Sequence, residues 1–257
     1  GGQSYWPYGL SSLADLARRR GIALAVLPAD GRDDTNLDAL STLPISTLRQ
    51  LQHLCDAGGA VAAQAALAQL ALAAGIYASP VMGAKTVPDC GWYLGGVVHA
   101  DMPALPDGPR VAVTFYRSYV TSADLAPIDA LMDQLRARGF APVGLFAPSL
   151  KAQGAGPFLR AALSQITPVA IINATAFSAK GEDGTSPLDT THAPVFQVAL
   201  STARRRDWAA SERGLSPADL AMHVVLPEVD GRVFAGLISH KSPQKRDPDL
   251  QYSRFAH

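Results

Sequence analysis

Residues 110–173 read RVAVTFYRSYVTSADLAPIDALMDQLRARGFAPVGLFAPSLKAQGAGPFLRAALSQITPVAIIN, and their pattern decides the fold. Three apolar runs of strand length occur in this stretch, at residues 110–116, 142–146 and 169–173. Two segments with the length and apolar spacing of helices, 124–138 and 157–165, separate these runs. Strands that alternate with helices over short connections predict a parallel sheet with helices on both faces.

The same alternation continues toward the C-terminus. It predicts strands at residues 195–200 and 233–238, and helices at residues 204–210 and 217–224. Residues 110–257 are therefore expected to form one α/β domain with a doubly wound, Rossmann-like or flavodoxin-like parallel sheet.

Residues 1–78 are expected to form a mostly helical α/β N-terminal part. Three stretches have helical spacing and are followed by a glycine: 10–20, 46–57 and 60–74. The apolar run 22–27 predicts a buried strand. Pro and Gly recur through residues 79–109, which predicts a linker without long regular elements.

Composition excludes several classes of function. The 257 residues carry 22 Lys and Arg against 22 Asp and Glu, so no net charge attracts the chain to nucleic acid or to an anionic membrane. No uninterrupted apolar run reaches about 18 residues, the length typical of a membrane span.

Cys55 and Cys90 form no CxxC pair, which favours a reducing compartment, the cytoplasm. Because the chain starts at Gly1 without Met or a signal peptide, we expect it to be cut from a longer protein.

Nucleotide and hydrolase motifs are missing from the sequence. The segment 83–86 reads GAKT, with Ala where a phosphate-binding loop requires Gly, so no ATP site is expected. No GxSxG motif occurs, which argues against a serine hydrolase. The six histidines are scattered without the spacing of a structural zinc site.

Polar residues follow several of the predicted strands. Ligands of open parallel sheets bind beyond the carboxyl ends of the strands, so Arg117, Lys151 and Asn173 are candidates for ligand contact. A capping or turn role is the alternative for each of them.

The segment 226–232 reads LPEVDGR and places Glu228 and Asp230 two residues apart, with His240 and Lys241 about ten residues further on. If this predicted turn and the end of the next strand face one cleft, the carboxylates and the imidazole could bind a metal ion and accept protons. The alternative is a solvated turn in which Asp230 is the turn residue.

Several segments resemble the family of CobN and the large magnesium chelatase subunit, and within it the aerobic cobaltochelatase type. They are YWPYG at 5–9, FYR at 115–117, NATAF at 173–177 and GLSPADLAMHVVLPEVDG at 214–231. The resemblance extends nearly from end to end. The chain departs from the family pattern at Pro28-Ala29-Asp30 and at Ser239-His240-Lys241.

This resemblance implies a fragment of a much longer subunit that binds a tetrapyrrole and inserts cobalt, the substrate metal, into hydrogenobyrinic acid a,c-diamide in cobalamin biosynthesis. It implies partners as well, an AAA+ ATPase and its companion subunit, which use ATP that is not bound here. The isolated fragment is expected to be inactive. Two alternatives remain, a homologue of the large magnesium chelatase subunit and a non-catalytic small-molecule-binding α/β module.

Roles for individual residues follow from the resemblance and from the chemistry of metal insertion. Two pyrrolic protons must leave as the divalent ion enters, which requires a base and weak metal ligands. We assign Glu228 and Asp230 as catalytic, and Glu228 with His240 as metal ligands. The expected substrate-binding residues are Arg117, Lys151, Asn173 and Lys241, because cations suit the carboxylates of a corrinoid tetrapyrrole.

Overall fold

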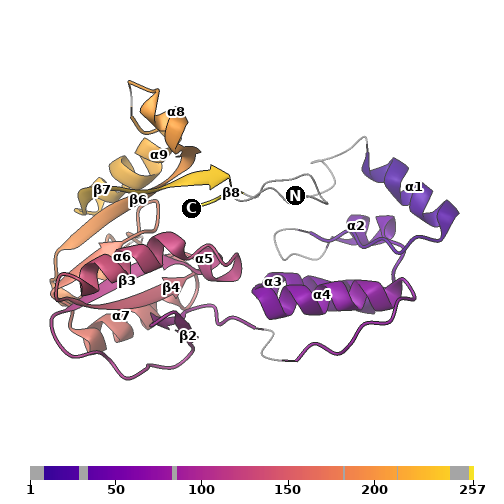
Figure 1. Ribbon diagram of the computed structural model, residues 1–257, viewed down its shortest axis with the longest axis horizontal. Helices are drawn as coiled ribbons and strands as arrows, with labels where there is room; N and C mark the ends of the chain where they lie inside the picture. The colour runs from indigo at the N-terminus through magenta and orange to yellow at the C-terminus, as the bar shows by residue number, and fades with distance from the viewer. Residues whose placement is uncertain (1–8, 29–33, 83–85, 182, 213, 244–254) are drawn as a thin grey trace. The chain divides into compact units, whose positions relative to one another are not determined.

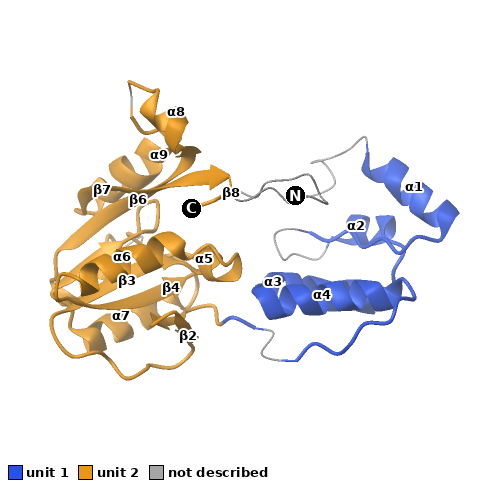
Figure 2. Cartoon of the chain, viewed as in Figure 1, with its two compact units in different colours: residues 1–87 blue, residues 88–257 orange. Residues whose placement is uncertain are grey.

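The computed structural model describes residues 9–28, 34–82, 86–181, 183–212, 214–243 and 255–257. The chain divides into two compact units, Gly1–Val87 and Pro88–His257 (Figure 2). Among the described residues, no helix is long and apolar enough to cross a membrane.

The first unit is helical. Its helices are α1 (Leu10–Arg20), α2 (Thr35–Leu40), α3 (Ile45–Ala57) and α4 (Ala60–Ala73). Gly58 and Gly59 have positive φ values of 69° and 85°, which lets the chain turn sharply between α3 and α4. The two helices bury a shared apolar core of Leu51, Leu54, Ala57, Ala62, Ala65 and Ala66.

The predicted strand at residues 22–27 is wrong. These residues form no helix or strand and join no sheet among the described residues. Side-chain hydroxyls take the place of a neighbouring strand: the amide of Leu24 donates to Thr42 Oγ1 at 2.7 Å, and the amide of Val26 donates to Ser41 Oγ at 2.9 Å. Apolar character alone therefore does not make a strand where no second strand can pair.

The second unit contains one sheet (Figure 1). Its strands are β1 (Gly91–Leu94), β2 (Val97–His99), β3 (Arg110–Tyr116), β4 (Ala141–Ala147), β5 (Ala170–Asn173), β6 (Val195–Arg204), β7 (Val233–Pro243) and β8 (Phe255–Ala256). The order is β2-β1-β4-β3-β5-β6-β7-β8, and the five strands from β4 to β7 in that order are parallel. Because β4 lies on one side of β3 and β5 on the other, the sheet is doubly wound in the flavodoxin order, and the predicted fold class is confirmed.

Helices connect the parallel strands. They are α5 (Arg117–Thr121), α6 (Ala126–Arg136), α7 (Ala155–Ile166), the 3-10 helix η2 (Pro187–Thr191), α8 (Arg205–Ala209), and a continuous helical run of α9 (Pro217–Leu220), the π-helical η3 (Ala221–Val225) and α10 (Leu226–Val229). The predicted turn at residues 226–232 is therefore wrong for Glu228, which lies on α10.

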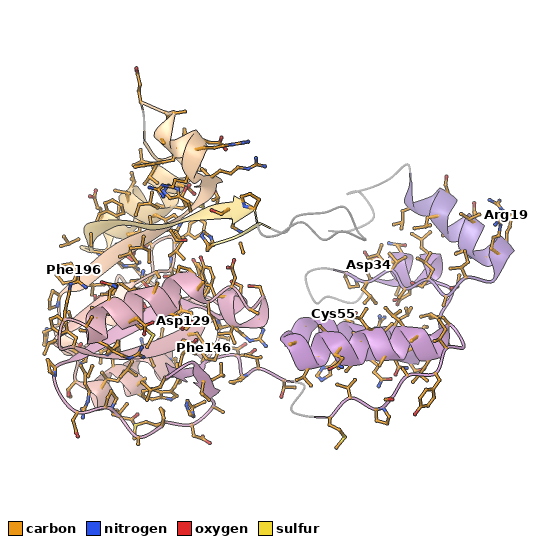
Figure 3. The ribbon with its side chains drawn as sticks, viewed as in Figure 1. Arg19, Asp34, Cys55, Asp129, Phe146 and Phe196 are labelled. Atoms are coloured by element: carbon orange, nitrogen blue, oxygen red, sulfur yellow. The ribbon has the colours of Figure 1, made fainter. Side chains whose placement is uncertain are left out.

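The two faces of the sheet have separate cores. On one face, Leu159 and Leu163 of α7 pack with Val143 and Leu145 of β4 and with Ile171. On the other face, the rings of Tyr93, Phe115 and Phe146 pack together. The Tyr93 hydroxyl donates to Asp129 of α6 at 2.6 Å, which fixes this helix over the second core. Figure 3 labels Asp129 on the helix and Phe146 on the sheet.

The linker predicted at residues 79–109 contains two strands of the sheet, so the expectation of a connector without regular structure is wrong there. Strand β1 pairs antiparallel with β4, and β2 pairs antiparallel with β1. The turn between them is Gly95-Gly96, with φ values of 60° and 82°. Positive φ at both central residues is the requirement of a type I′ turn, one of the two common two-residue hairpin turns.

Candidate functional site

A row of polar side chains crosses the middle of the sheet. Thr114 of β3, Asn173 of β5 and Gln197 of β6 are direct neighbours in the strand register. Thr114 Oγ1 donates to Asn173 Oδ1 at 2.6 Å, and Asn173 Nδ2 donates to Gln197 Oε1 at 2.7 Å. All three side chains are at most 1% exposed, so each needs its partner inside the protein.

This row holds the loop that follows β5. The carbonyl of Thr175 accepts from Asn173 Nδ2 at 3.2 Å and from Gln197 Nε2 at 2.7 Å. Tyr116 OH, at the end of β3, donates to the carbonyl of Ala176 and accepts from its amide, at 3.0 and 2.9 Å. Phe177 has a φ of 67°, and its amide donates to the carbonyl of Met222 on η3 at 2.8 Å. The loop is therefore fixed from β3, β6 and η3 together.

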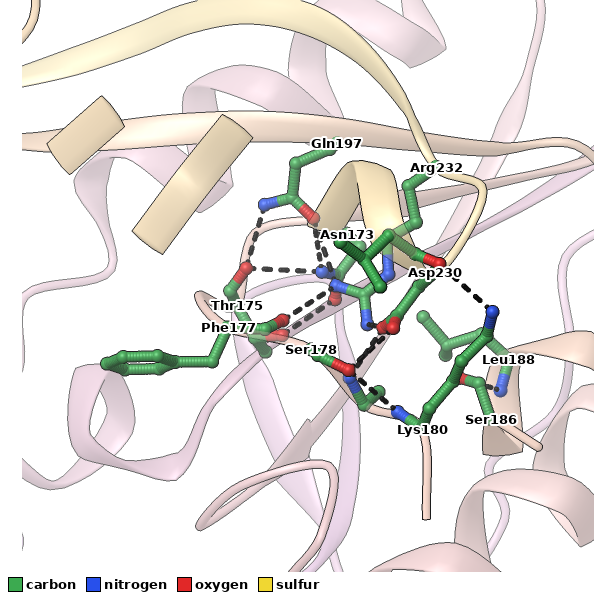
Figure 4. Close-up of polar contacts among 12 residues, drawn as sticks. Asn173, Thr175, Phe177, Ser178, Lys180, Ser186, Leu188, Gln197, Asp230 and Arg232 are labelled. Atoms are coloured by element: carbon green, nitrogen blue, oxygen red, sulfur yellow. Dashed lines mark hydrogen bonds and ion pairs between the residues drawn. The ribbon is translucent and has the colours of Figure 1, made fainter. Parts of the chain in front are cut away.

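A buried ion pair completes the network (Figure 4). Arg232 Nη2 and Asp230 Oδ2 are 2.6 Å apart, and their side chains are 2% and 1% exposed. Arg232 Nη1 also donates to Gln197 Oε1 at 3.1 Å and to the carbonyl of Phe177 at 3.3 Å. Burial lowers the pKa of Arg232 from its ordinary value, and the charge of Asp230 opposes that effect.

Asp230 also binds the far end of the same loop. Its carboxylate accepts from the hydroxyl of Ser178 at 2.6 Å and from the amide of Ala179 at 2.5 Å. With the guanidinium of Arg232, these donors occupy both carboxylate oxygens. The sequence-based assignments of Asp230 as catalytic and of Asn173 as substrate-binding are not supported by this geometry, because both side chains are buried and bind the protein itself.

Glu228 and His240 lie at different ends of β7. Glu228 is exposed on α10, which precedes the first residue of the strand, Val233. His240 is seven residues further along the strand, a distance of about 23 Å at 3.3 Å per residue. The two residues therefore cannot hold one metal ion together in this conformation. No group of three potential metal ligands occurs among the residues that the structure describes.

The three candidate cations occupy separate places. Arg117 begins α5, where its Nε donates to the carbonyl of Pro88 at 3.0 Å and lies 3.7 Å from Asp89 Oδ1. Lys151 is exposed and lines a cavity beside α7. Lys241 lies near the end of β7. Burial lowers the pKa of His257, and the charge of Lys241 adds to that effect. The structure does not gather these residues into one site.

A polar cluster that the sequence did not predict lies at the carboxyl ends of β6 and β7. We call it the strand-end cluster, and its members are Asp124, Ser201, Asp219, His223 and His257. Asp219 is 0% exposed and accepts from Ser201 Oγ at 2.7 Å. The amide of His257 donates to Asp124 Oδ1 at 3.0 Å, and its ring nitrogen Nδ1 lies 3.2 Å from Ser239 Oγ.

The imidazoles of the strand-end cluster favour the neutral form. Burial lowers the pKa of His223 and of His257, and the acids Asp219 and Asp124 oppose that effect. His223 is 6% exposed, and its Nδ1 has no hydrogen-bond partner within the described part of the chain. Neutral imidazoles at the carboxyl edge of a parallel sheet are suited to accept protons. The signals that could have found this cluster are Ser201-Thr202 after β6 and His223 inside the segment 214–231.

Comparisons with known proteins agree with this fold. Residues 46–256 match the family described as CobN/Magnesium Chelatase. The chain is 34% identical over its whole length to an aerobic cobaltochelatase subunit CobN of Sinorhizobium sp and covers 21% of that protein. It is 30% identical over 94% of its length to the subunit of the same name from Pseudomonas aeruginosa and covers 20% of that protein. A magnesium-chelatase subunit of Rhodobacter capsulatus is 29% identical over 55% of the chain and is covered to 14%.

A solved structure has the same fold. The catalytic subunit of cobaltochelatase from Mycobacterium tuberculosis superposes with a TM-score of 0.70 at 24% identity, over 100% of this chain and 21% of that protein. The chain therefore spans about a fifth of the length of the cobaltochelatase proteins that it matches.

Proposed function

This chain belongs to the CobN/Magnesium Chelatase family, and from that membership we propose that it is one part of the tetrapyrrole-binding subunit of an aerobic cobaltochelatase. The observation that carries the proposal is the extent of the similarity. The two cobaltochelatase subunits match 100% and 94% of the chain, whereas the magnesium-chelatase protein matches 55%. The substrates of the complete subunit would be cobalt and a corrinoid tetrapyrrole, hydrogenobyrinic acid a,c-diamide.

Metal insertion divides into tasks that side chains can perform. A base must take two pyrrolic protons, and a weak ligand must deliver the metal ion and release it. Glu228 is proposed for one or both tasks, because it is an exposed carboxylate on the segment with the most specific resemblance to the family. The neutral imidazoles of the strand-end cluster are further candidates for proton acceptance. His240 is not proposed as a ligand together with Glu228, since β7 separates them.

ATP hydrolysis is proposed to occur on partner subunits, an AAA+ ATPase and its companion, because the sequence has no phosphate-binding loop. The complex is proposed to work in the cytoplasm. The isolated 257-residue chain should then show neither ATPase activity nor cobalt insertion. Turnover by this chain alone at the rate of a complete chelatase would contradict the proposal.

The decisive test uses the complete subunit with its ATP-hydrolysing partners. Replacing Glu228 by Gln should lower the rate of cobalt insertion at least tenfold, a lower bound on the roughly 10²–10⁴-fold contribution of one acid–base group. The matched control is Glu212→Gln, which removes another exposed carboxylate of the same unit and should leave the rate unchanged. A normal rate with Glu228→Gln would remove this residue from the proposed site.

The magnesium chelatase alternative is tested by substrate choice. The complete subunit should insert Co²⁺ into hydrogenobyrinic acid a,c-diamide and should not insert Mg²⁺ into a tetrapyrrole. The opposite preference would assign the chain to the magnesium branch of the family.

A further inference from the structure

A cavity of about 570 Å³ opens between α7 and the loops that follow β4 and β5. This volume is within the range of small-molecule sites in proteins. We call it the basic pocket, and the lining residues that matter here are Lys151, Gly156, Arg160, Lys180, Asp183 and Thr185. They come from three separate segments, which only the fold brings together.

Positive charge predominates in the described lining of the basic pocket. Lys151, Arg160 and Lys180 are cationic, and Asp183 is the one acid among the described lining residues. The carboxylate of Asp183 already accepts from the amide and hydroxyl of Thr185, at 3.0 and 2.8 Å, and these bonds lower its pKa. Lys180 Nζ donates one bond, to the carbonyl of Val229 at 3.0 Å, and an ammonium group has two further donors.

Arg160 lies where a helix tolerates a cation poorly. Its side chain runs back to the first turn of α7: a Cβ atom on Gly156 would stand 3.2 Å from Nη2 of Arg160. That turn contains no acidic residue, and Gly154 provides no side-chain cap. Because the N-terminal end of a helix carries partial positive charge, a guanidinium there favours a nearby anion. Asp183 is one such anion, since the charge of Arg160, after the bonds from Thr185, helps to lower the pKa of its carboxyl.

We propose that the basic pocket binds a carboxylate side chain from the rim of the tetrapyrrole, and this inference rests on the proposed function. The planar guanidinium of Arg160 makes two parallel hydrogen bonds to the carboxylate, and Lys151 and Lys180 contribute charge. A doubly charged phosphate fits less well, since Asp183 repels the second negative charge. The missing side chain of Gly156 provides the space for Arg160 to take this position.

The test measures binding of hydrogenobyrinic acid a,c-diamide to the 257-residue chain through the absorption and fluorescence of the tetrapyrrole. Replacing Arg160 by Gln should raise the Kd at least tenfold and make binding less sensitive to salt. Gly156→Ala, which favours the helix but displaces the guanidinium, should weaken binding in the same direction. The matched control is Arg138→Gln, an exposed arginine outside the basic pocket, which should bind as the original chain does.

Three results would overturn the inference. They are equal affinity in Arg160→Gln and the original chain, no tetrapyrrole binding by the original chain, and Arg160-dependent binding of inorganic phosphate without tetrapyrrole binding. None of these results decides the proposed function, which depends on cobalt insertion by the complete subunit. If the complete subunit did not insert cobalt while tetrapyrrole binding still depended on Arg160, the proposed function would be wrong and the assignment of the basic pocket would stand.

Discussion

At the scale of single residues, neighbouring positions of one motif have different surroundings. Asp230 and Glu228 are two residues apart in the segment LPEVDGR. The helix ends between them, so Glu228 stays on the exposed face of α10 while Asp230 turns inward to Arg232. Spacing along the chain could not distinguish the two carboxylates, because the difference depends on Arg232, Ser178 and Ala179 meeting at one point.

Replacing Asp230 by Asn should mainly cost stability. The substitution leaves the buried guanidinium of Arg232 without its counter-charge, and breaking a buried pair in this way typically costs about 3–5 kcal/mol. Urea unfolding followed by circular dichroism measures the effect. Asp207→Asn is the control, since its pair with Arg206 is exposed and should contribute at most about 1 kcal/mol. Equal losses of unfolding free energy in the two variants would show that the buried pair stabilises the fold no more than the exposed pair does.

His223 should make the second unit sensitive to mild acid. Burial lowers the pKa of His223 in the folded protein, whereas the unfolded chain titrates near its ordinary value, about 6.5. As the pH falls through that value the unfolded state binds a proton that the folded state does not, so stability present above about pH 6.5 is progressively lost below it.

Melting temperatures at pH 7.5 and 6.0 test this dependence. The difference between the two temperatures should be smaller in His223→Leu than in the original chain. His53→Gln, at an exposed position in the first unit, should keep the original difference. An unchanged difference in His223→Leu would mean that His223 takes up its proton without loss of stability.

At the scale of elements, local pattern predicts the strands that are long and apolar. The predicted strand 110–116 has the bounds of β3, and the runs 142–146 and 195–200 lie inside β4 and β6. Strands β1 and β2 were missed because each has at most four residues and prolines surround them. Gly95-Gly96 between two short apolar runs was the available signal for the hairpin.

The polar network needed information that no pattern along the chain contains. Thr114, Asn173 and Gln197 are neighbours only because the sheet order places β5 between β3 and β6. Each residue looks like an ordinary strand position by itself. Residues 173–177, directly after β5, were a reasonable candidate for ligand contact, but the polar groups of this first part of the loop are bound by the protein.

Strand β1 should depend on Gly144 of β4. A Cβ atom at this position would stand 2.8 Å from the carbonyl oxygen and 2.9 Å from the Cβ of Tyr93, so Gly144→Ala must push the two strands apart. Overpacking of this kind costs about 1–3 kcal/mol. The free energy of unfolding should fall by that amount, and the amides of β1 should exchange faster with solvent. Gly156→Ala serves as the control, since its Cβ meets only the flexible end of Arg160. Unchanged protection of the β1 amides against exchange in Gly144→Ala would contradict the close approach of Tyr93 to Gly144.

At the scale of the whole molecule, the boundary of the sheet-containing unit differs from the prediction. Composition placed the start of the α/β domain at residue 110, after the Pro-rich and Gly-rich stretch. The structure places the start of the second unit at Pro88, so the unit includes β1 and β2. The boundary could not be read from composition because the hairpin is stabilised by β4, which comes some 50 residues later in the chain.

Two fragments, 88–257 and 110–257, distinguish these boundaries. The first should fold as a cooperative monomer, because it contains the whole sheet, the cores of both faces and the buried network from Thr114 to Arg232. The second lacks Trp92 and Tyr93, which are each 3% exposed, and leaves the edge of β4 unpaired. A buried aromatic side chain removes about 150–250 Å² from water, and an unpaired apolar edge promotes association. Fragment 110–257 should therefore unfold at a lower urea concentration than fragment 88–257, or elute as an aggregate on size-exclusion chromatography. Equal stability of the two fragments would show that β1 and β2 are dispensable to the sheet.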